Sequence, residues 1–435
     1  MPNDIYSLID EIDLNKEVIF GYVKEISGDK IKATNLRVSI GDFVYIQNNF
    51  KSIKGVVTSV TSDYFVIILF GQVEGFTIND KVFKYNHGLD LKISNGFNGR
   101  ILNGLGVPID NKGPISHTEE HKNINIVKDP IAALSRKSIT EVFETGVKAI
   151  DGILTVGKGQ KMGIFAGSGV GKSTLLSMIT KNSKSDIKVI ALIGERGREV
   201  SEFIEQNLNN DLTNIVLIVA TSDESPIMRK YAAYTALTIA EYFRDEGNDI
   251  LFILDSITRV AIAQREIGIM SEELPVLKGY TPSVFTLLPQ LLERIANINN
   301  GTMTGFFTVL VDGDDMNDPI ADQTRSILDG HIILNRKLTE QGIYPPIDIL
   351  KSASRVVDSI LDEVEIEKQT KFRRILGVLE ENKTIINIGS YQRGSNKEID
   401  FAIMKKEALF QFIKQGKRVK FHYNDIKEEL TKVIS

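Results

Sequence analysis

The sequence contains no cysteine among its 435 residues. Disulfides, thiolate nucleophiles and zinc or iron–sulfur sites with cysteine ligands are therefore excluded. Long apolar runs are missing too: the longest, such as residues 64–70, fall far short of the roughly 20 residues that span a bilayer. Residues 1–11 are acidic, whereas a secretory signal has a basic start and then an apolar stretch. We therefore expect a cytoplasmic protein whose contact with a membrane goes through partners.

An excess of positive charge is also absent. Lys and Arg number 52 against 57 Asp and Glu, which gives a net charge of −5. Proteins whose main task is to grip a nucleic-acid backbone are usually basic, so we expect no nucleic-acid partner. The 42% apolar and 25% charged residues are typical of a globular protein. At about 150 residues per domain, the length predicts about three domains.

The first 17 residues form an acidic segment with apolar side chains at helical spacing. Ile5, Leu8, Ile9 and Ile12 follow the i, i+3, i+4, i+7 pattern of one helix face. Such a helix either packs on its own domain or docks a partner protein. Its acidic face argues against binding to anionic lipid, which attracts Lys and Arg. We predict an N-terminal docking segment over residues 1–17.

The rest of the chain changes pattern twice. Short β-rich runs separated by turns predict a β-barrel over residues 18–90. Within residues 91–355, a lead-in rich in Gly and Pro turns precedes apolar runs that alternate with helical stretches, which is typical of a parallel sheet buried on both faces. Residues 356–435 are charged and helical, with an amphipathic repeat over 401–412. The predicted strands are 18–24, 30–33, 42–46, 55–60 and 64–70 in the barrel, and 162–166, 189–193, 215–220, 250–254 and 305–311 in the sheet.

One possible metal motif lies in the lead-in. His117-Thr-Glu-Glu-His121 matches the H-x-x-E-H pattern of some zinc proteases. That pattern requires a helix with an apolar back face, but here it follows Gly-Pro in a polar segment. We therefore expect a solvated loop and no metal ion at this motif.

A glycine-rich loop follows the first strand of the predicted sheet. Residues 162–165 run into Ala166-Gly-Ser-Gly-Val-Gly-Lys-Ser-Thr174, and a helical stretch comes next. This strand–loop–helix context is that of a P-loop, whose backbone N–H groups converge on phosphate oxygens at a helix N-terminus. Lys172 would reach the β- and γ-phosphates, and the Ser173 hydroxyl would ligate Mg²⁺. The contributing loop residues are Gly167, Ser168, Gly169, Val170, Gly171, Lys172, Ser173 and Thr174.

Two further strands end in carboxylates. The strand 250–254 is followed by Asp255, the arrangement in which a carboxylate holds Mg²⁺ through its coordination shell. The strand 189–193 is followed by Gly194 and Glu195, and Glu195 would orient and polarise an attacking water. An alternative for residues 195–199, Glu-Arg-Gly-Arg-Glu, is a surface charge cluster that pairs with itself.

Several stretches resemble the ATPases of type III protein export, a family that includes the flagellar export ATPase and its injectisome relative. It is similar in turn to the α and β subunits of rotary ATP synthases. The resemblance is dense from about residue 99 to residue 394 and looser over the barrel and the C-terminal helices. The matching stretches are 145–173, 194–200, 255–266, 313–322 and 345–354.

The resemblance implies roles for further residues. Glu195 falls on the catalytic glutamate, which non-catalytic α-type subunits lack. Arg355 falls on the arginine finger that reaches the γ-phosphate in a neighbouring subunit, and Tyr344 on the aromatic residue that stacks on adenine. Arg196 and Arg259 fall on family positions near the phosphates.

The resemblance predicts a RecA-like P-loop core with an N-terminal β-barrel and a C-terminal helical domain. It implies MgATP hydrolysis by a homohexameric ring that energises type III export, with flagellar export as our first choice. Implied partners are a peripheral-stalk regulator, a coiled-coil central stalk, chaperone–substrate complexes and the membrane export gate. The ring would lie in the cytoplasm, held at the inner membrane through the export apparatus.

Four alternatives remain open. The first is the injectisome ATPase, because the shared core carries nearly all the motifs. The second is the catalytic subunit of a rotary ATP synthase. The third is an RNA-driven ring helicase, although the barrel sequence shows no conspicuous basic–aromatic face. The fourth is a non-enzymatic ring subunit, against which Glu195 argues.

Overall fold

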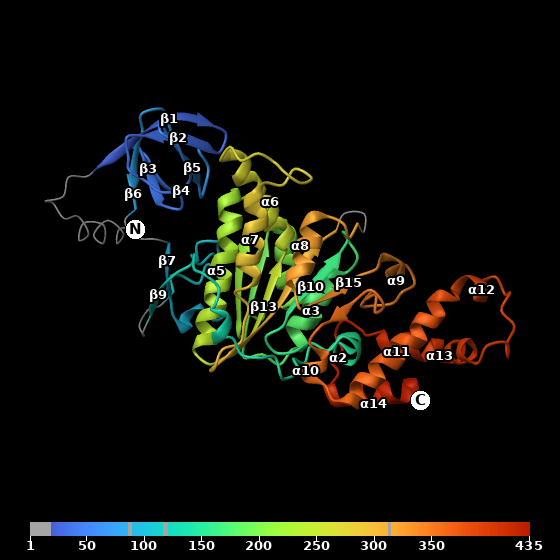
Figure 1. Ribbon diagram of the computed structural model, residues 1–435. Coiled ribbons are helices and arrows are strands. Elements are labelled where there is room, and N and C mark those ends of the chain that lie inside the picture. Colours follow the sequence, from blue (N-terminus) through green and yellow to red (C-terminus); the bar gives the residue numbers. More distant parts are fainter. Residues whose placement is uncertain (1–18, 86–88, 116–120, 312–314) are drawn as a thin grey trace. The chain divides into compact units, whose positions relative to one another are not determined.

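The computed structural model describes residues 19–85, 89–115, 121–311 and 315–435 (Figure 1). The predicted docking segment 1–17 and most of the His117–His121 motif lie outside these residues. The described chain divides into two compact units: the barrel with residues 270–272, and the remainder from residue 89 on. The boundaries predicted at residues 90 and 355 stay predictions.

The N-terminal unit is a closed β-barrel, as predicted. Its strand order is β1-β2-β5-β4-β3-β6, and every pairing is antiparallel. Alternate residues point inward: Val23, Ile31, Val44 and Ile67 are buried in one apolar core. The barrel strands are β1 (Phe20–Ser27), β2 (Lys30–Thr34), β3 (Phe43–Gln47), β4 (Ser52–Val60), β5 (Phe65–Leu69) and β6 (Lys81–Lys84).

The centre of the second unit is an eight-stranded sheet with the order β16-β15-β10-β14-β13-β11-β12-β8. The strands from β15 to β8 run parallel, and β16 is antiparallel at the edge. The central strands are mostly apolar and almost entirely buried, as expected of a parallel sheet covered on both faces. The strands are β8 (Ile101–Leu102), β10 (Lys161–Ala166), β11 (Ile187–Ile193), β12 (Ile215–Ala220), β13 (Asp249–Asp255), β14 (Thr302–Leu310), β15 (Gly330–Ile333) and β16 (Ala353–Ser354).

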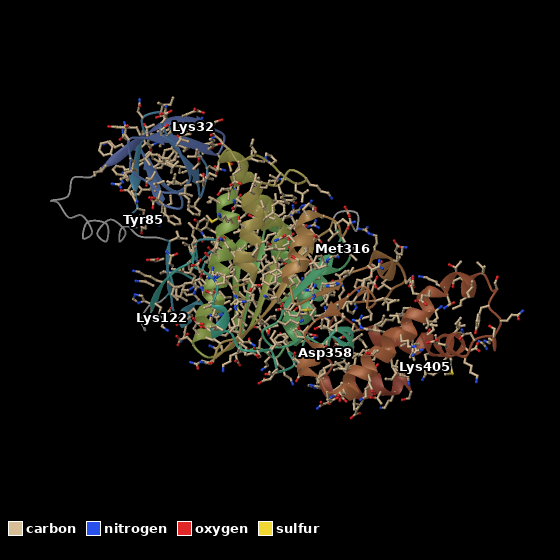
Figure 2. All side chains as sticks on the ribbon, viewed as in Figure 1. Lys32, Tyr85, Lys122, Met316, Asp358 and Lys405 are labelled. Carbon is tan, nitrogen blue, oxygen red and sulfur yellow. The ribbon has the colours of Figure 1, made fainter. Side chains whose placement is uncertain are left out.

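Helices cover the sheet on both faces (Figure 1). The long helix α5 packs on β11, β12, β13 and β14, and it begins with Ser225 as its cap and Pro226 in its first turn. Figure 2 shows side chains filling the space between the sheet and its helices. The helices along this part are α2 (Lys148–Ile153), α3 (Lys172–Asn182), α4 (Gly197–Glu202), the π-helical turn η3 (Phe203–Asn207), α5 (Pro226–Asp245), α6 (Ile257–Met270), α7 (Pro282–Leu292), α8 (Pro319–Ile327) and α9 (Arg336–Glu340).

The C-terminal segment is helical, as predicted, and shares a core with the sheet. Phe372 on α11 and Phe412 on α13 are buried in the same apolar cluster as Met162 and Ile164 on β10. The predicted repeat over 401–412 lies within α13. The helices are α10 (Val357–Ile360), α11 (Glu363–Glu381), α12 (Lys383–Asn387), α13 (Lys397–Ile413) and α14 (Tyr423–Ile434).

The lead-in segment carries little regular structure of its own. Strands β7 (Asp90–Ile93) and β9 (Lys122–Asn125) pair with each other, and η1 (Asn95–Phe97) and η2 (Ala133–Ser135) are single 3₁₀ turns. A buried arginine, Arg294, connects this segment to helix α5, which packs on the sheet. It donates to Glu241 on α5 over 2.8 and 2.7 Å and to the Ile126 carbonyl over 3.0 Å.

Among the described helices, none combines the length and apolar character needed to cross a bilayer. The described residues also hold no cluster of three or more His, Asp or Glu side chains arranged to bind a metal ion. His121 is described, but residues 117–120 of its motif are not.

Candidate nucleotide site

The glycine-rich loop links β10 to α3, as the sequence predicts. Gly169 and Gly171 have φ angles of +74° and +104°, which side-chain-bearing residues rarely adopt. Within the described chain, no side chain caps α3, so the N–H groups of its first turn are available to an anion. The local structure is therefore that of a phosphate-binding loop.

Lys172, the first residue of α3, lies between two carboxylates. Its Nζ is 2.5 Å from Oδ1 of Asp255 and 3.0 Å from Oε1 of Glu195. Burial alone would lower the pKa of Lys172, but the negative charges of Asp255 and Glu195 outweigh burial and raise it above its ordinary value. The structure thus brings together three residues that the sequence places on three separate elements.

Ser173 completes this group. Ser173, Glu195 and Asp255 line one small cavity of about 130 Å³. Ser173 supplies a hydroxyl and Glu195 and Asp255 supply carboxylates, the oxygen ligands that Mg²⁺ prefers, and Glu199, Glu202, Gln206 and Asn207 also line the cavity. Asp255 also accepts a hydrogen bond from Thr308 on β14, whose hydroxyl donates to the same Oδ1 over 2.6 Å.

Arg259 on α6 packs directly on the residue before Glu195. Gly194 has a φ of +71°, and a Cβ added there would lie 2.7 Å from Cβ of Arg259. Nε of Arg259 is buried, and it has no hydrogen-bond partner in the part of the chain that the structure describes. Arg259 therefore lies against the backbone that leads into Glu195.

The other two predicted arginines lie at the surface. Arg196 is exposed and its Nη1 is 3.8 Å from Oε1 of Glu199, as the surface-cluster alternative predicts for that pair. Arg355 is also exposed. Its backbone N–H donates to the Asp329 carbonyl over 2.9 Å, and its Nη2 to the Arg325 carbonyl over 3.4 Å. Within the single chain, neither arginine joins the Lys172 group.

Tyr344 lies on a loop that reaches the start of α3. Pro346, two residues on, is 3.7 Å from the position that a Cβ would take at Gly171. Tyr344 is partly exposed and lines an open cavity of about 380 Å³ with residues 414–417. The backbone N–H of Gln415 donates to the Tyr344 carbonyl over 2.7 Å, so C-terminal residues hold this loop in place.

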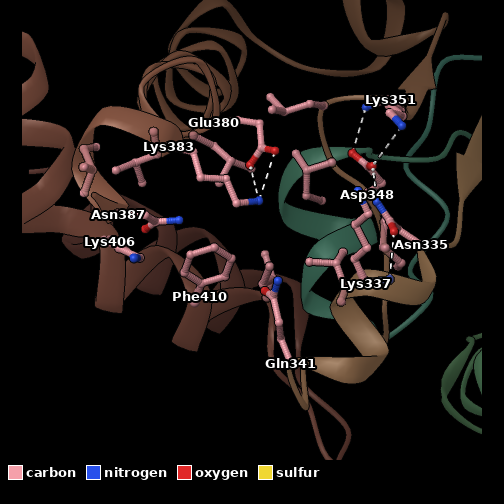
Figure 3. Close-up of a pocket in the computed structure, with 18 residues that line it drawn as sticks. Asn335, Lys337, Gln341, Asp348, Lys351, Glu380, Lys383, Asn387, Lys406 and Phe410 are labelled. Carbon is pink, nitrogen blue, oxygen red and sulfur yellow. Dashed lines mark hydrogen bonds and ion pairs between the residues drawn. The ribbon is translucent and has the colours of Figure 1, made fainter. Parts of the chain in front are cut away.

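The turn at α9 also contacts the phosphate loop. Nη2 of Arg336 donates to the Ser168 carbonyl over 2.8 Å. Beside this turn lies a third cavity of about 410 Å³, lined by residues of α9, α11 and α13 (Figure 3). Some of the polar side chains that line this cavity bond to each other: Asn335 donates to Asp348, and Lys383 donates to Glu380.

Sequence reasoning missed two residues of this site. Thr308 interrupts an apolar strand with a hydroxyl at the level of Asp255, a signal that could have been noticed. Arg336 carries no such signal, because its contact depends on the fold of the α9 turn.

Comparison with known proteins places the chain in a family. The pattern described as "ATP synthase alpha/beta family, nucleotide-binding domain" matches residues 146–354, and "T3SS EscN ATPase C-terminal domain" matches residues 361–432. The "Flagellum-specific ATP synthase" of Helicobacter pylori strain 26695 is 50% identical over 417 residues, which cover 95% of each chain. The chain belongs to the type III export ATPase family.

Solved structures agree with this assignment to the export ATPases. The assembled ATPase EscN of the enteropathogenic E. coli type III secretion system matches with a TM-score of 0.90 and 38% identity, over 95% of this chain and 100% of that one. EscN in complex with its central stalk EscO matches with a TM-score of 0.87, at the same identity and coverage. The predicted fold, the predicted ATPase activity and the family resemblance are therefore confirmed, and the flagellar choice is supported by the Helicobacter relative.

Proposed function

We propose that this chain hydrolyses MgATP as one subunit of a homohexameric ring that energises flagellar type III export. The observation that carries the proposal is the group at the phosphate loop. Lys172 at the start of α3 lies within hydrogen-bond distance of Glu195, which follows β11, and of Asp255 at the end of β13. In this group a cation is paired with the proposed general base, Glu195, and the proposed metal-binding carboxylate, Asp255, and these two carboxylates line one small cavity.

In the proposed mechanism, ATP binds with its β- and γ-phosphates on the N–H groups of residues 167–174. Lys172 exchanges its carboxylate partners for phosphate oxygens and neutralises charge that develops in the transition state. Glu195 then accepts a hydrogen bond from the attacking water and orients it in line with the γ-phosphate. The adenine base would stack on Tyr344, and Arg259 and Arg196 would contribute further positive charge near the phosphates.

The residues at the small cavity fit a magnesium ion. Ser173 and Asp255 would hold it, and hard oxygen donors with room for water are the usual environment of Mg²⁺. When bound, Mg²⁺ would neutralise charge on the β- and γ-phosphate oxygens.

The ring is proposed from the position of Arg355. This arginine is exposed rather than turned toward its own Lys172, as expected of a residue that completes a neighbour's site. Loss of an arginine finger typically costs about 10³-fold or more in turnover. The structural relative EscN is described as assembled and as forming a complex with a central stalk, which supports a ring with a stalk for this chain.

The proposed biological role follows from the flagellar relatives. We infer that the ring lies in the cytoplasm at the inner membrane, held there by a peripheral-stalk regulator and the export gate. It would receive chaperone–substrate complexes and contain a coiled-coil central stalk. An injectisome ATPase is the second candidate, because EscN itself belongs to a secretion system.

The chemical part of the proposal is tested by ATP hydrolysis with two matched variants. Glu195→Gln should lower turnover by about 10²-fold or more, because general-base catalysis contributes about 10²- to 10⁴-fold. Nucleotide binding should persist in this variant. Glu205→Gln makes the same chemical change at an exposed residue of η3 and should keep wild-type turnover. Equal activity of the two variants would contradict the role of Glu195.

The biological part is tested by copurification. The Glu195→Gln chain, expressed in its native cells, should hold ATP and retain its partners. Flagellar stalk and chaperone proteins among them would support the proposal, whereas injectisome components would support the second candidate. Rotary ATP synthase stalk subunits would contradict both.

A further inference from the structure

The strand β14 lies between the two strands that carry the nucleotide site. It pairs with β10, which leads into the phosphate loop, and with β13, which ends at Asp255. Thr308 on β14 is fully buried, and its neighbours Phe306, Phe307 and Val309 are apolar and buried. A hydroxyl in such surroundings needs a partner, because an unpaired buried polar group is costly.

The partner of that hydroxyl is the carboxylate of Asp255. The distance from Thr308 Oγ1 to Oδ1 is 2.6 Å, typical of a hydrogen bond to an ionised acceptor. The Leu254 carbonyl lies farther away, at 3.4 Å, so a neutral acceptor is within reach but is not the nearer one. The Leu254 carbonyl could pair the hydroxyl by itself. The closer contact with Asp255 therefore indicates a role for this hydrogen bond beyond pairing a buried hydroxyl.

The arrangement around Asp255 is one-sided. Both hydrogen bonds to its side chain within the described chain, from Lys172 and from Thr308, end on Oδ1. Oδ2 is left for another partner. When Lys172 turns to phosphate oxygens, Thr308 is the donor that still fixes Oδ1 and with it the plane of the carboxylate.

We propose that Thr308 is a positioning residue, which holds Asp255 in the orientation needed to bind the magnesium ion of MgATP. This inference rests on the proposed function of the site. Groups that orient a metal ligand typically contribute about 10- to 100-fold to metal affinity. Thr308 touches neither nucleotide nor metal in this proposal and acts only through Asp255.

The same strand offers a matched control. Thr304 is also fully buried on β14, and its hydroxyl accepts a hydrogen bond from the Gly159 N–H over 2.9 Å. Its partner in the register is Leu251, four residues before Asp255. Thr304→Val therefore removes a buried, bonded hydroxyl from the same strand without touching the nucleotide site.

The test compares full-length Thr308→Val, Thr308→Ser and Thr304→Val with wild type. Binding of Mn²⁺ in the presence of ADP is measured from the electron paramagnetic resonance signal of free Mn²⁺. ATP turnover is measured as a function of Mg²⁺, and melting temperatures show how far each variant is destabilised. Thr308→Ala serves as a second variant without the hydroxyl if Thr308→Val does not fold.

We expect Thr308→Val to bind Mn²⁺ about tenfold more weakly and to need about tenfold more Mg²⁺ for half-maximal turnover. Thr308→Ser should restore both values, and Thr304→Val should change neither, whatever its melting temperature. If Thr308→Val or Thr308→Ala melts lower but binds Mn²⁺ as wild type does, the role is purely structural and the proposal is overturned. If wild type itself neither binds Mn²⁺ with ADP nor hydrolyses ATP, the proposed function fails, and this inference with it.

Discussion

Lys172 pairs with both carboxylates of the candidate nucleotide site within the chain itself. Its ammonium group is shared between Asp255 and Glu195, and the two carboxylates raise its pKa in spite of its burial. The sequence motifs predict each of these residues separately, because strand, loop and carboxylate spacing are local properties. Their mutual contact depends on the strand order, which places β14 between β10 and β13.

A first prediction concerns Gly194. Replacement by Ala should destabilise the protein by about 2 kcal/mol or more, because a left-handed conformation costs roughly 1–2 kcal/mol for a residue with a Cβ and this Cβ would also collide with Arg259. Turnover should fall, since Glu195 follows directly. Urea unfolding and ATP hydrolysis measure the two effects.

The neighbouring Gly197 provides the control. A Cβ there meets nothing within 4 Å, so Gly197→Ala should leave both stability and turnover near wild type. A Gly194→Ala protein that unfolds and turns over like Gly197→Ala would show that the close contact with Arg259 is unimportant.

A second prediction concerns the pH dependence of the Arg100–Asp110 pair. Nε and Nη2 of Arg100 donate to the two Asp110 oxygens over 2.7 and 2.8 Å, and these bonds hold the pKa of Asp110 well below its usual range. A depressed pKa means that the pair stabilises the folded state above the unfolded-state pKa of about 3.9. That contribution is lost as the pH falls below this value toward the folded-state pKa.

Asp110→Asn should therefore lower the free energy of unfolding at pH 7 by about 3 kcal/mol, as expected for breaking a largely buried pair. The difference from wild type should shrink between pH 4 and pH 3 in urea titrations. Asp322→Asn breaks the more exposed Arg325–Asp322 pair and should change stability by less than about 1 kcal/mol. A difference for Asp110→Asn that stays constant down to pH 3 would argue against the ion pair as its cause.

At the scale of the elements, buried polar groups join segments that the hydrophobic pattern leaves separate. Arg294 follows α7, yet it contacts Glu241 and Thr238 on α5 and the carbonyl that follows β9. The charge of Arg294 outweighs the effect of burial and lowers the pKa of Glu241. This network fixes the otherwise irregular lead-in segment on the sheet layer.

A third prediction tests that network with a double-mutant cycle. Arg294→Met should cost about 3–5 kcal/mol in the free energy of unfolding, because it leaves Glu241 buried with only Lys128 as a charged partner among the described residues. Adding Glu241→Gln should cost clearly less than it does in the wild-type background. Urea unfolding of the four proteins gives a coupling energy, and additivity within about 0.5 kcal/mol would contradict the network.

Most elements were predictable from the sequence, and the exceptions have physical reasons. The five apolar runs of the sheet and five of the six barrel strands were identified because burial leaves a continuous or alternating apolar pattern. Strand β6 was missed: it is only four residues long, Lys81-Val-Phe-Lys84, and two of them are lysines. Short edge strands such as β8 and β16 owe their structure to their partners rather than to their own pattern.

At the scale of the whole molecule, the proposed site is divided between residues that one chain brings together and a residue that it leaves at its surface. Lys172, Ser173, Glu195 and Asp255 belong to the first group, and Arg355 to the second. The sequence motifs of one chain could not predict this division, because a residue that contacts a neighbouring subunit has no characteristic local sequence pattern. The resemblance to a ring-forming family supplied that expectation.

A fourth prediction follows from this division. Lys172→Ala and Arg355→Ala chains should each be inactive alone, but their equimolar mixture should recover about one quarter of wild-type activity. In a ring with head-to-tail contacts, a site is intact only when an Arg355→Ala chain is followed by a Lys172→Ala neighbour, and random assembly gives that arrangement at about one site in four. ATP hydrolysis after mixing and reassembly measures the recovery.

The control mixture combines Lys172→Ala with Glu195→Gln. Both residues belong to the same chain's site, so every site in this mixture lacks one of them and no recovery is expected. Equal recovery in the two mixtures, or none in either, would count against a site shared between subunits.

The position of Lys172 also bears on the order in which ligands enter. With its ammonium group on Asp255 and Glu195, the free chain offers a lone divalent cation a site where one positive charge already offsets half of the charge of the two carboxylates. A triphosphate changes this, because it gives Lys172 new acceptors and releases the carboxylates at the same moment. Metal and nucleotide are then expected to bind together as one complex. Lys172 couples the two binding events, because it leaves the carboxylates only when phosphate oxygens replace them.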